Sequence, residues 1–98
     1  MGMTTVTIKV KNPENPSKVI EEDFLVDSGA AFTVLPQRLV KKLGLTPSYA
    51  QKFTLADGKI IVRNIGKAFI EYQGRETAVP VVLGKEKDTS LLGVLTLE

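Results

Sequence analysis

Apolar and polar residues alternate along much of this chain, a pattern typical of half-buried β-strands. Within residues 4–11, the apolar residues Val6, Ile8 and Val10 alternate with polar ones, which predicts a strand with one buried face. A segment rich in Asn and Pro, 12–17, separates it from a second predicted strand, 18–26, and we expect the two strands to form a hairpin. Similar apolar runs predict further strands at residues 32–35, 51–55, 60–65, 67–72 and 77–83.

One short helix interrupts these strands. Pro36 suits the first position of a helix, and the residues up to Leu43 follow helical spacing. Lys41 and Lys42 favour the negative end of the helix dipole, and Gly44 is a good C-terminal cap. A second helical pattern begins at the end of the chain. We therefore expect an all-β protein with one or two short helices, folded as a small barrel or sandwich.

Composition and charge narrow the classes of function. The 98 residues form a single predicted domain, and a net charge of +2 without a basic run gives no support for nucleic-acid binding. The chain contains no Cys and no His, which excludes Cys-His and Ser-His catalysis and the usual zinc ligands. No apolar stretch is long enough to cross a membrane, and we expect a cytoplasmic protein.

The segment Asp27-Ser28-Gly29 is the strongest candidate for chemistry. It follows the apolar run Phe24-Leu25-Val26, so a carboxylate emerges at the end of a buried strand. Such a carboxylate can serve as an acid or as a base. Because it cannot do both at once, a single catalytic carboxylate implies a second, partner carboxylate. Asp-Ser-Gly is also a good turn sequence, so a purely structural turn stays open. Ser28 does not fit a hydrolase nucleophile, because no His and no Gly-x-Ser-x-Gly elbow accompany it.

Three elements, taken in order, resemble the retropepsin-like aspartic proteases of clan AA. The first is the run Leu25-Val26-Asp27-Ser28-Gly29-Ala30, followed closely by Thr33-Val34-Leu35. The second is a predicted hairpin around Asp57-Gly58, at the place of the family's flap. The third is Leu91-Leu92-Gly93, which fits the family's later apolar-apolar-Gly element. The short helix at 36–43 is closer to microbial members than to retroviral ones.

The resemblance implies a role for each matching residue. Asp27 would be the catalytic carboxylate, and the active-site loop around it would be Ser28, Gly29 and Ala30. The substrate-binding flap would have its tip at Ala56, Asp57, Gly58 and Lys59. The element that packs beneath the loop and supports it would be Leu91, Leu92 and Gly93. Two departures bear on specificity: Ala31-Phe32 stands where retroviral members often have acidic residues, and the flap tip is not Gly-rich.

The implied fold is a small closed acid-protease-like barrel with a β-hairpin flap. The implied activity is that of an aspartic endopeptidase, a hydrolase in which one Asp27 from each subunit of a homodimer activates water. Peptides or proteins would be the substrates, with no metal, cofactor, nucleic acid or membrane involved. Family members continue through a helix and a terminal strand, so we expect the single domain 1–98 to be truncated at its C-terminus, with a monomer as an alternative state.

Two other classes of function stay open at this point. The barrel can serve as a non-proteolytic module that binds an extended peptide or protein by strand addition at an exposed edge. A bare structural barrel is the third interpretation. A transition-state mimic of the pepstatin type separates these classes, because it should bind only a working pair of carboxylates.

Overall fold

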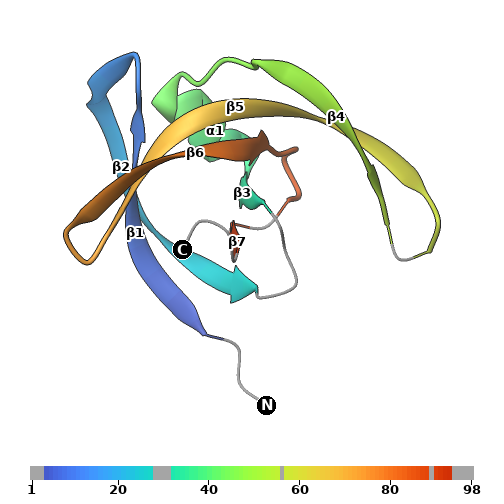
Figure 1. The fold of residues 1–98 in the computed structure, drawn as a ribbon, viewed down its shortest axis with the longest axis horizontal. Helices are drawn as coiled ribbons and strands as arrows, with labels where there is room; N and C mark the ends of the chain where they lie inside the picture. The colour runs from blue at the N-terminus through green and yellow to red at the C-terminus, as the bar shows by residue number, and fades with distance from the viewer. Residues whose placement is uncertain (1–3, 28–31, 56, 89, 94–98) are drawn as a thin grey trace.

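A computed structural model of the protein describes residues 4–27, 32–55, 57–88 and 90–93. Within these residues strands predominate, and there is one short helix (Figure 1). The all-β class is therefore confirmed. In chain order the elements are β1 (Thr5–Asn12), β2 (Asn15–Asp27), β3 (Thr33–Leu35), α1 (Gln37–Leu43), β4 (Tyr49–Thr54), β5 (Ile60–Tyr72), β6 (Arg75–Leu83) and β7 (Leu91–Gly93).

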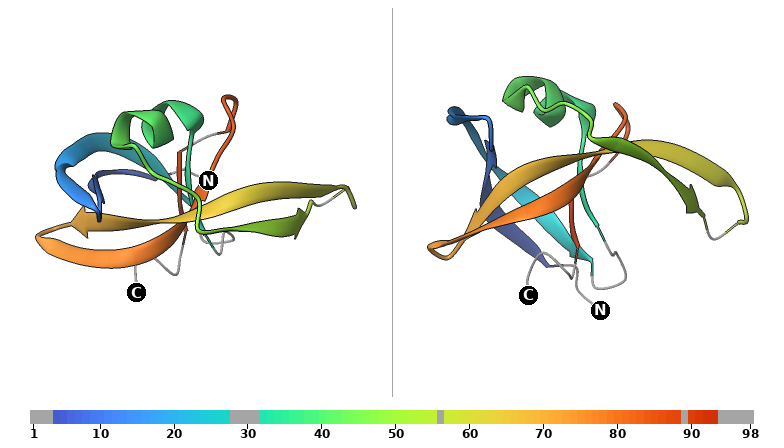
Figure 2. Two further views of the ribbon diagram at one scale, coloured as in Figure 1. Left: turned by 90° about the horizontal axis from the view of Figure 1, so that it is seen from above. Right: turned by 45° about the horizontal axis from the view of Figure 1, so that its top comes forward.

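The strands form one sheet in the order β1-β2-β7-β3-β6-β5-β4, with a further pairing of β1 with β5. The sheet curls so that its first strand meets β5 over Lys9–Lys11. The expectation of a closed barrel needs correction, because β4 lies outside this curl. In the described part of the chain β4 pairs with β5 alone, and β4 projects from the body together with the first part of β5 (Figures 1 and 2).

The β1–β2 hairpin was predicted correctly but its connection is tighter than expected. Only Pro13 and Glu14 separate the two strands, since β2 begins at Asn15 rather than at Lys18. The alternation of β1 is also as predicted: Ile8 and Val10 are buried, whereas Thr7 and Lys9 are exposed. These buried side chains point into the core.

Two predicted strands, 60–65 and 67–72, are one continuous strand, β5. Gly66 between them pairs with Val81 and does not end the strand. A Cβ atom at Gly66 would lie 3.1 Å from the backbone oxygen of Thr46 and 3.2 Å from the side chain of Leu83. The glycine therefore marks a close approach of neighbouring chain. The seventh strand is β7, which sequence periodicity could not reveal in only three residues.

Helix α1 begins one residue later than predicted, with Pro36 as its N-terminal cap, and ends at Gly44 as expected. Gly44 adopts a left-handed conformation, with φ of 68°, that glycine tolerates best. Figure 2 shows the helix on one side of the curled sheet. Its buried face carries Leu39 and Leu43 into the core.

The core lies between the curled sheet and this helix. Its largest fully buried side chain is Phe24, from the strand that leads to Asp27. The other buried members of this cluster are Ile8, Val10, Ile20, Leu35, Leu39, Leu43, Ala68, Ile70, Val79, Val81 and Leu83. The core thus ties β1, β2, β3, β5 and β6 together beside the end of β2. The described chain contains no helix long and apolar enough to span a membrane.

Candidate active site

Asp27 is the last residue of β2, at the point where the chain leaves the sheet (Figure 1). The backbone just before it is held on two sides. The amide of Val26 donates to the oxygen of Thr4 at 2.8 Å, and the amide of Leu25 donates to the oxygen of Ser90 at 3.1 Å. Asp27 is therefore carried by a well-anchored strand. The predicted loop residues Ser28, Gly29 and Ala30 lie outside the described residues.

The predicted support element Leu91-Leu92-Gly93 forms β7, which runs parallel to the end of β2. Leu25 pairs with Leu91, Val26 with Leu92, and Asp27 with Gly93. Residues that lie far apart in sequence thus become direct neighbours. This pairing brings the backbone of the predicted support element to the predicted catalytic residue.

The other side of β7 meets the strand that follows the active-site loop. Val34 of β3 pairs antiparallel with Leu91. β7 therefore lies between β2, which enters the loop at residues 28–31, and β3, which leaves it. Strand β3 is held in turn by a parallel pairing with β6 over Thr33–Leu35. Both ends of the loop are fixed to the same small set of strands.

The predicted flap belongs to a projecting hairpin, which we call the arm. It consists of β4, the first residues of β5 as far as Asn64, and the turn between them. At the turn, the amide of Leu55 donates to the oxygen of Lys59 at 2.7 Å. Gly58 has a φ of 87°, and the amide of Lys59 donates to Oδ1 of Asp57 at 3.0 Å. Asp57, Gly58 and Lys59 are exposed, and Ala56 lies outside the described residues.

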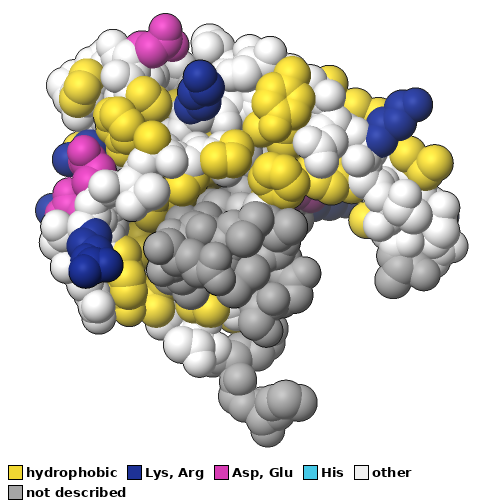
Figure 3. All heavy atoms as spheres, viewed as in Figure 1, with side chains coloured by type: hydrophobic (Ala, Val, Ile, Leu, Met, Phe, Trp, Pro, Cys, Tyr) yellow, Lys and Arg dark blue, Asp and Glu magenta, His cyan; other side chains and the backbone are white. Residues whose placement is uncertain are grey.

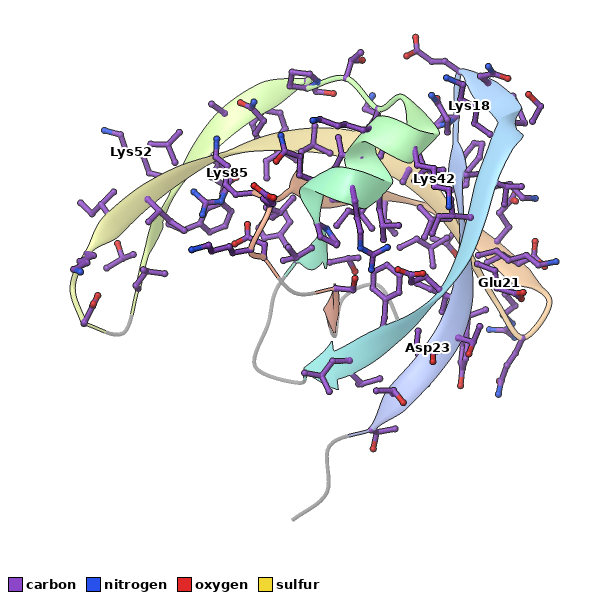
Figure 4. All side chains as sticks on the ribbon, turned by 180° about the vertical axis from the view of Figure 1, so that it is seen from behind. Lys18, Glu21, Asp23, Lys42, Lys52 and Lys85 are labelled. Atoms are coloured by element: carbon purple, nitrogen blue, oxygen red, sulfur yellow. The ribbon has the colours of Figure 1, made fainter. Side chains whose placement is uncertain are left out.

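The two faces of the arm differ. Strand pairing matches Phe53 with Ile61 and Gln51 with Arg63, and directly paired residues share a face. On this inner face these four side chains are half-buried, whereas Tyr49, which lies on the same face at the base of the arm, is exposed. The outer face carries the exposed residues Ala50, Lys52, Thr54, Ile60, Val62 and Asn64. Figure 3 shows the arm standing out from the body, and Lys52 in Figure 4 points away from it.

Two contacts from the inner face were not predicted. The ring of Phe53 meets the ring of Phe32 edge to face, with centroids 5.8 Å apart and planes at 89°. Nε of Arg63 lies 3.2 Å from Oδ2 of Asp88. Alternation along the strands could place Phe53 and Arg63 on the same face of the hairpin. Their partners, however, come from distant segments that only the tertiary structure brings close.

Asp88 lies in the connection between β6 and β7 and has a second partner besides Arg63. Its Oδ2 also accepts the amide of Lys85 at 2.7 Å. Partial burial opposes ionisation of this carboxyl, but the hydrogen bond from Lys85 and the Arg63 guanidinium outweigh it and lower the pKa of Asp88. The ionised carboxylate thus joins the arm to the segment that leads into β7.

No group of His, Cys, Asp and Glu side chains in the described residues is arranged to hold a metal ion. The chemistry available at the end of β2 is that of a carboxylate residue whose backbone pairs with a glycine.

A family model described as "gag-polyprotein putative aspartyl protease" matches residues 19–98 of the chain. The match includes the larger part of β2 with Asp27, the arm and β7. The chain belongs to this aspartyl protease family. No curated protein sequence matches it significantly.

The chain also resembles solved structures in its fold. It is similar to EIAV protease complexed with the inhibitor HBY-793, at 17% identity and a TM-score of 0.66, over 98% of this chain and 86% of that one. It is also similar to a retropepsin-like aspartic protease from Rickettsia conorii, at 18% identity and a TM-score of 0.55, over 99% of this chain and 81% of that one. The retropepsin-like fold is thereby confirmed.

Proposed function

We propose that this chain is an aspartic endopeptidase that works as a homodimer, with Asp27 of each subunit supplying one half of the catalytic pair. The observation that carries the proposal is the place of Asp27 within the family match, at the end of a core-anchored strand and paired with Gly93. Substrates would be peptides or proteins. The catalytic unit needs no metal or organic cofactor.

The chemistry requires two carboxylates in one site. Carboxylates about 3 Å apart cannot both ionise, so they share one proton, as the two aspartates of pepsin do. The ionised member takes a proton from water, which attacks the scissile carbonyl, while the protonated member donates to the carbonyl oxygen. Since the chain carries one Asp-Ser-Gly segment, the second carboxylate would come from Asp27 of another copy, across a two-fold axis.

The surrounding residues have roles in this proposal. Ser28, Gly29 and Ala30 would form the loop that presents the carboxylates to the substrate. Gly93, Leu91 and Leu92 would hold that loop from the neighbouring strand. The arm would act as the flap, with Asp57, Gly58 and Lys59 at its tip, together with Ala56. Its half-buried inner face, rather than the exposed outer face, would lie toward the substrate.

The test compares Asp27→Asn with a matched substitution, Asp23→Asn. Asp23 lies earlier in the same strand on an exposed face, where its Oδ1 accepts the Thr7 hydroxyl at 2.5 Å (Figure 4). Both variants replace a β2 carboxylate by its amide. We expect Asp27→Asn to abolish peptide cleavage with the fold intact, and Asp23→Asn to retain cleavage. Cleavage by Asp27→Asn at the original rate would refute the assignment.

A pepstatin-type inhibitor supplies a second measurement. It mimics the tetrahedral transition state and should bind the active homodimer more tightly than it binds Asp27→Asn. Peptide binding that is equal in both proteins, without cleavage by either, would instead indicate a binding module that keeps the fold.

A further inference from the structure

Two side chains of the arm's inner face, Phe53 and Arg63, contact distant segments of the described chain. Phe53 meets Phe32, which directly precedes β3. Arg63 meets Asp88, which lies between β6 and β7. One contact is therefore made to the segment after the predicted catalytic loop, and the other to the segment before the predicted support strand.

The aromatic contact suits a positioning role. Edge-to-face rings at 5.8 Å and 89° are in a favoured geometry, so the contact fixes orientation as well as distance. Phe53 is near the turn of the arm and Phe32 is beside the loop at residues 28–31. Both side chains are half-buried. Locking these rings therefore sets where the outer part of the arm lies relative to that loop.

The ionic contact acts nearer the base of the arm. The Arg63 side chain is 18% exposed and that of Asp88 is 28% exposed, so water screens the pair only partly. Asp88 is itself fixed by the amide of Lys85. Nη1 of Arg63 donates to the oxygen of Val62 at 3.1 Å, which restrains the guanidinium from the arm's own backbone. The partner on the body and the side chain on the arm are thus both ordered.

We infer that Phe53 and Arg63 are positioning residues that anchor the arm at two points, on the two segments that flank the candidate active site. A two-stranded hairpin is marginally stable in water by itself. The arm therefore needs contacts of this kind to keep its ladder and its place. The anchoring is a property of the free protein, and its catalytic consequence rests on the proposed function.

That consequence concerns substrate binding more than the chemical step. An arm already held in place loses less freedom when substrate binds, which lowers the cost of association. Neither Phe53 nor Arg63 is assigned to the reacting atoms. Weakening an anchor should therefore raise KM for peptide substrates while kcat changes little.

Amide hydrogen exchange of the full chain tests the anchoring without any need for activity. The variants are Phe53→Ala, Phe32→Ala and the double variant, with Val62→Ala as the matched control. Val62 is an exposed residue on the outer face of the same arm. We expect each single aromatic variant to speed exchange of the arm amides by about 2- to 13-fold. The double variant should exchange only slightly faster than the single variants, because each single substitution already removes the same ring contact.

The same measurement tests the second anchor through Arg63→Gln, for which we expect about 1.4- to 5-fold faster exchange in the arm. Phe53→Leu and Phe32→Leu keep an apolar side chain, so they should fold even if the Ala variants do not. An arm exchange rate between that of the parent and that of the Ala variants would support the ring contact. Arm exchange that matches the Val62→Ala control in every anchor variant would overturn the proposal.

Kinetics then separate this inference from the proposed protease activity. If the parent cleaves peptides, Phe53→Ala should raise KM several-fold with kcat within about twofold, whereas an unchanged KM would contradict the catalytic consequence. If the parent cleaves nothing, the proposed function fails, and the exchange data still decide whether the arm is anchored.

Discussion

Gly93 lies directly beside Asp27 in the parallel pairing of β7 with β2. Asp27 ends the strand that leads from the buried Phe24 to the candidate catalytic loop. The pairing lets a strand from the end of the chain hold the backbone of that carboxylate, with no side chain at the partner position. A protease that must hold two such carboxylates at a fixed separation benefits when strand pairing fixes the backbone of each.

Cleavage should depend steeply on protein concentration. Each chain carries one Asp-Ser-Gly segment, so the proposed catalytic pair exists only in a dimer. In the range where the dimer dissociates, we expect the rate to rise more than linearly with concentration. Parallel measurements of cleavage rate and sedimentation mass check this. A strictly linear rate from a proven monomer would contradict the shared pair.

Acid should weaken the contribution of Asp88 to stability. Its pKa is lowered in the folded state, so its stabilisation is present above the ordinary aspartate pKa, about 4, and is lost as pH falls through the folded-state value. The difference in free energy of unfolding between the parent and Asp88→Asn should be largest near neutral pH and shrink in acid.

Urea unfolding of both proteins across this pH range measures the difference. Glu14→Gln is a suitable control, because Glu14 is an exposed carboxylate of the β1–β2 turn. A gap between the parent and Asp88→Asn that stays constant from neutral to strongly acidic pH would count against the ion pair with Arg63.

Asn12→Ala should destabilise the fold through the end of helix α1. Asn12 is buried, and its Nδ2 donates to the oxygen of Leu43 at 2.8 Å while its Oδ1 accepts the amide of Glu14 at 2.8 Å. Removing the side chain leaves a helix carbonyl and a turn amide without these partners, at a cost of about 1–3 kcal/mol. Chemical denaturation gives the value.

The control for this change is Asn15→Ala, in the same hairpin. Asn15 is exposed, and its Oδ1 accepts the hydroxyl of the nearby Ser17 at 2.7 Å. We expect its effect to stay within about 0.5 kcal/mol. Equal losses in the two variants would show that burial of Asn12 is not what matters.

Gly84→Ala should disturb the junction of β3 with the β6–β7 connection. A Cβ atom there would lie 2.8 Å from the backbone oxygen of Leu35, to which the Gly84 amide already donates at 2.7 Å. The backbone cannot yield as a flexible side chain would, so we expect a loss of about 1–3 kcal/mol. Thermal or urea unfolding measures it, with the adjacent exposed Lys85→Ala as the control. An unchanged free energy of unfolding would show that the backbone around Gly84 can move aside to accommodate a Cβ atom.

Local sequence signals predicted much of the framework. Alternation identified β1, and the cap pattern of Lys41, Lys42 and Gly44 identified the end of α1, because these features depend on near neighbours. The chemistry-bearing segment around Asp27 and the Asp57-Gly58 turn were also visible in the sequence. Strand β7 was not assigned as a strand, because three residues carry no measurable periodicity.

The sequence by itself therefore determined most of the elements, the absence of Cys and His chemistry, and the place of the carboxylate at a strand end. Tertiary structure alone decided that Gly93 would lie beside Asp27, and that Phe53 would reach Phe32. Local patterns specify which face of a strand is buried. They do not specify which distant strand covers it, because that choice depends on the packing of the whole sheet around its core.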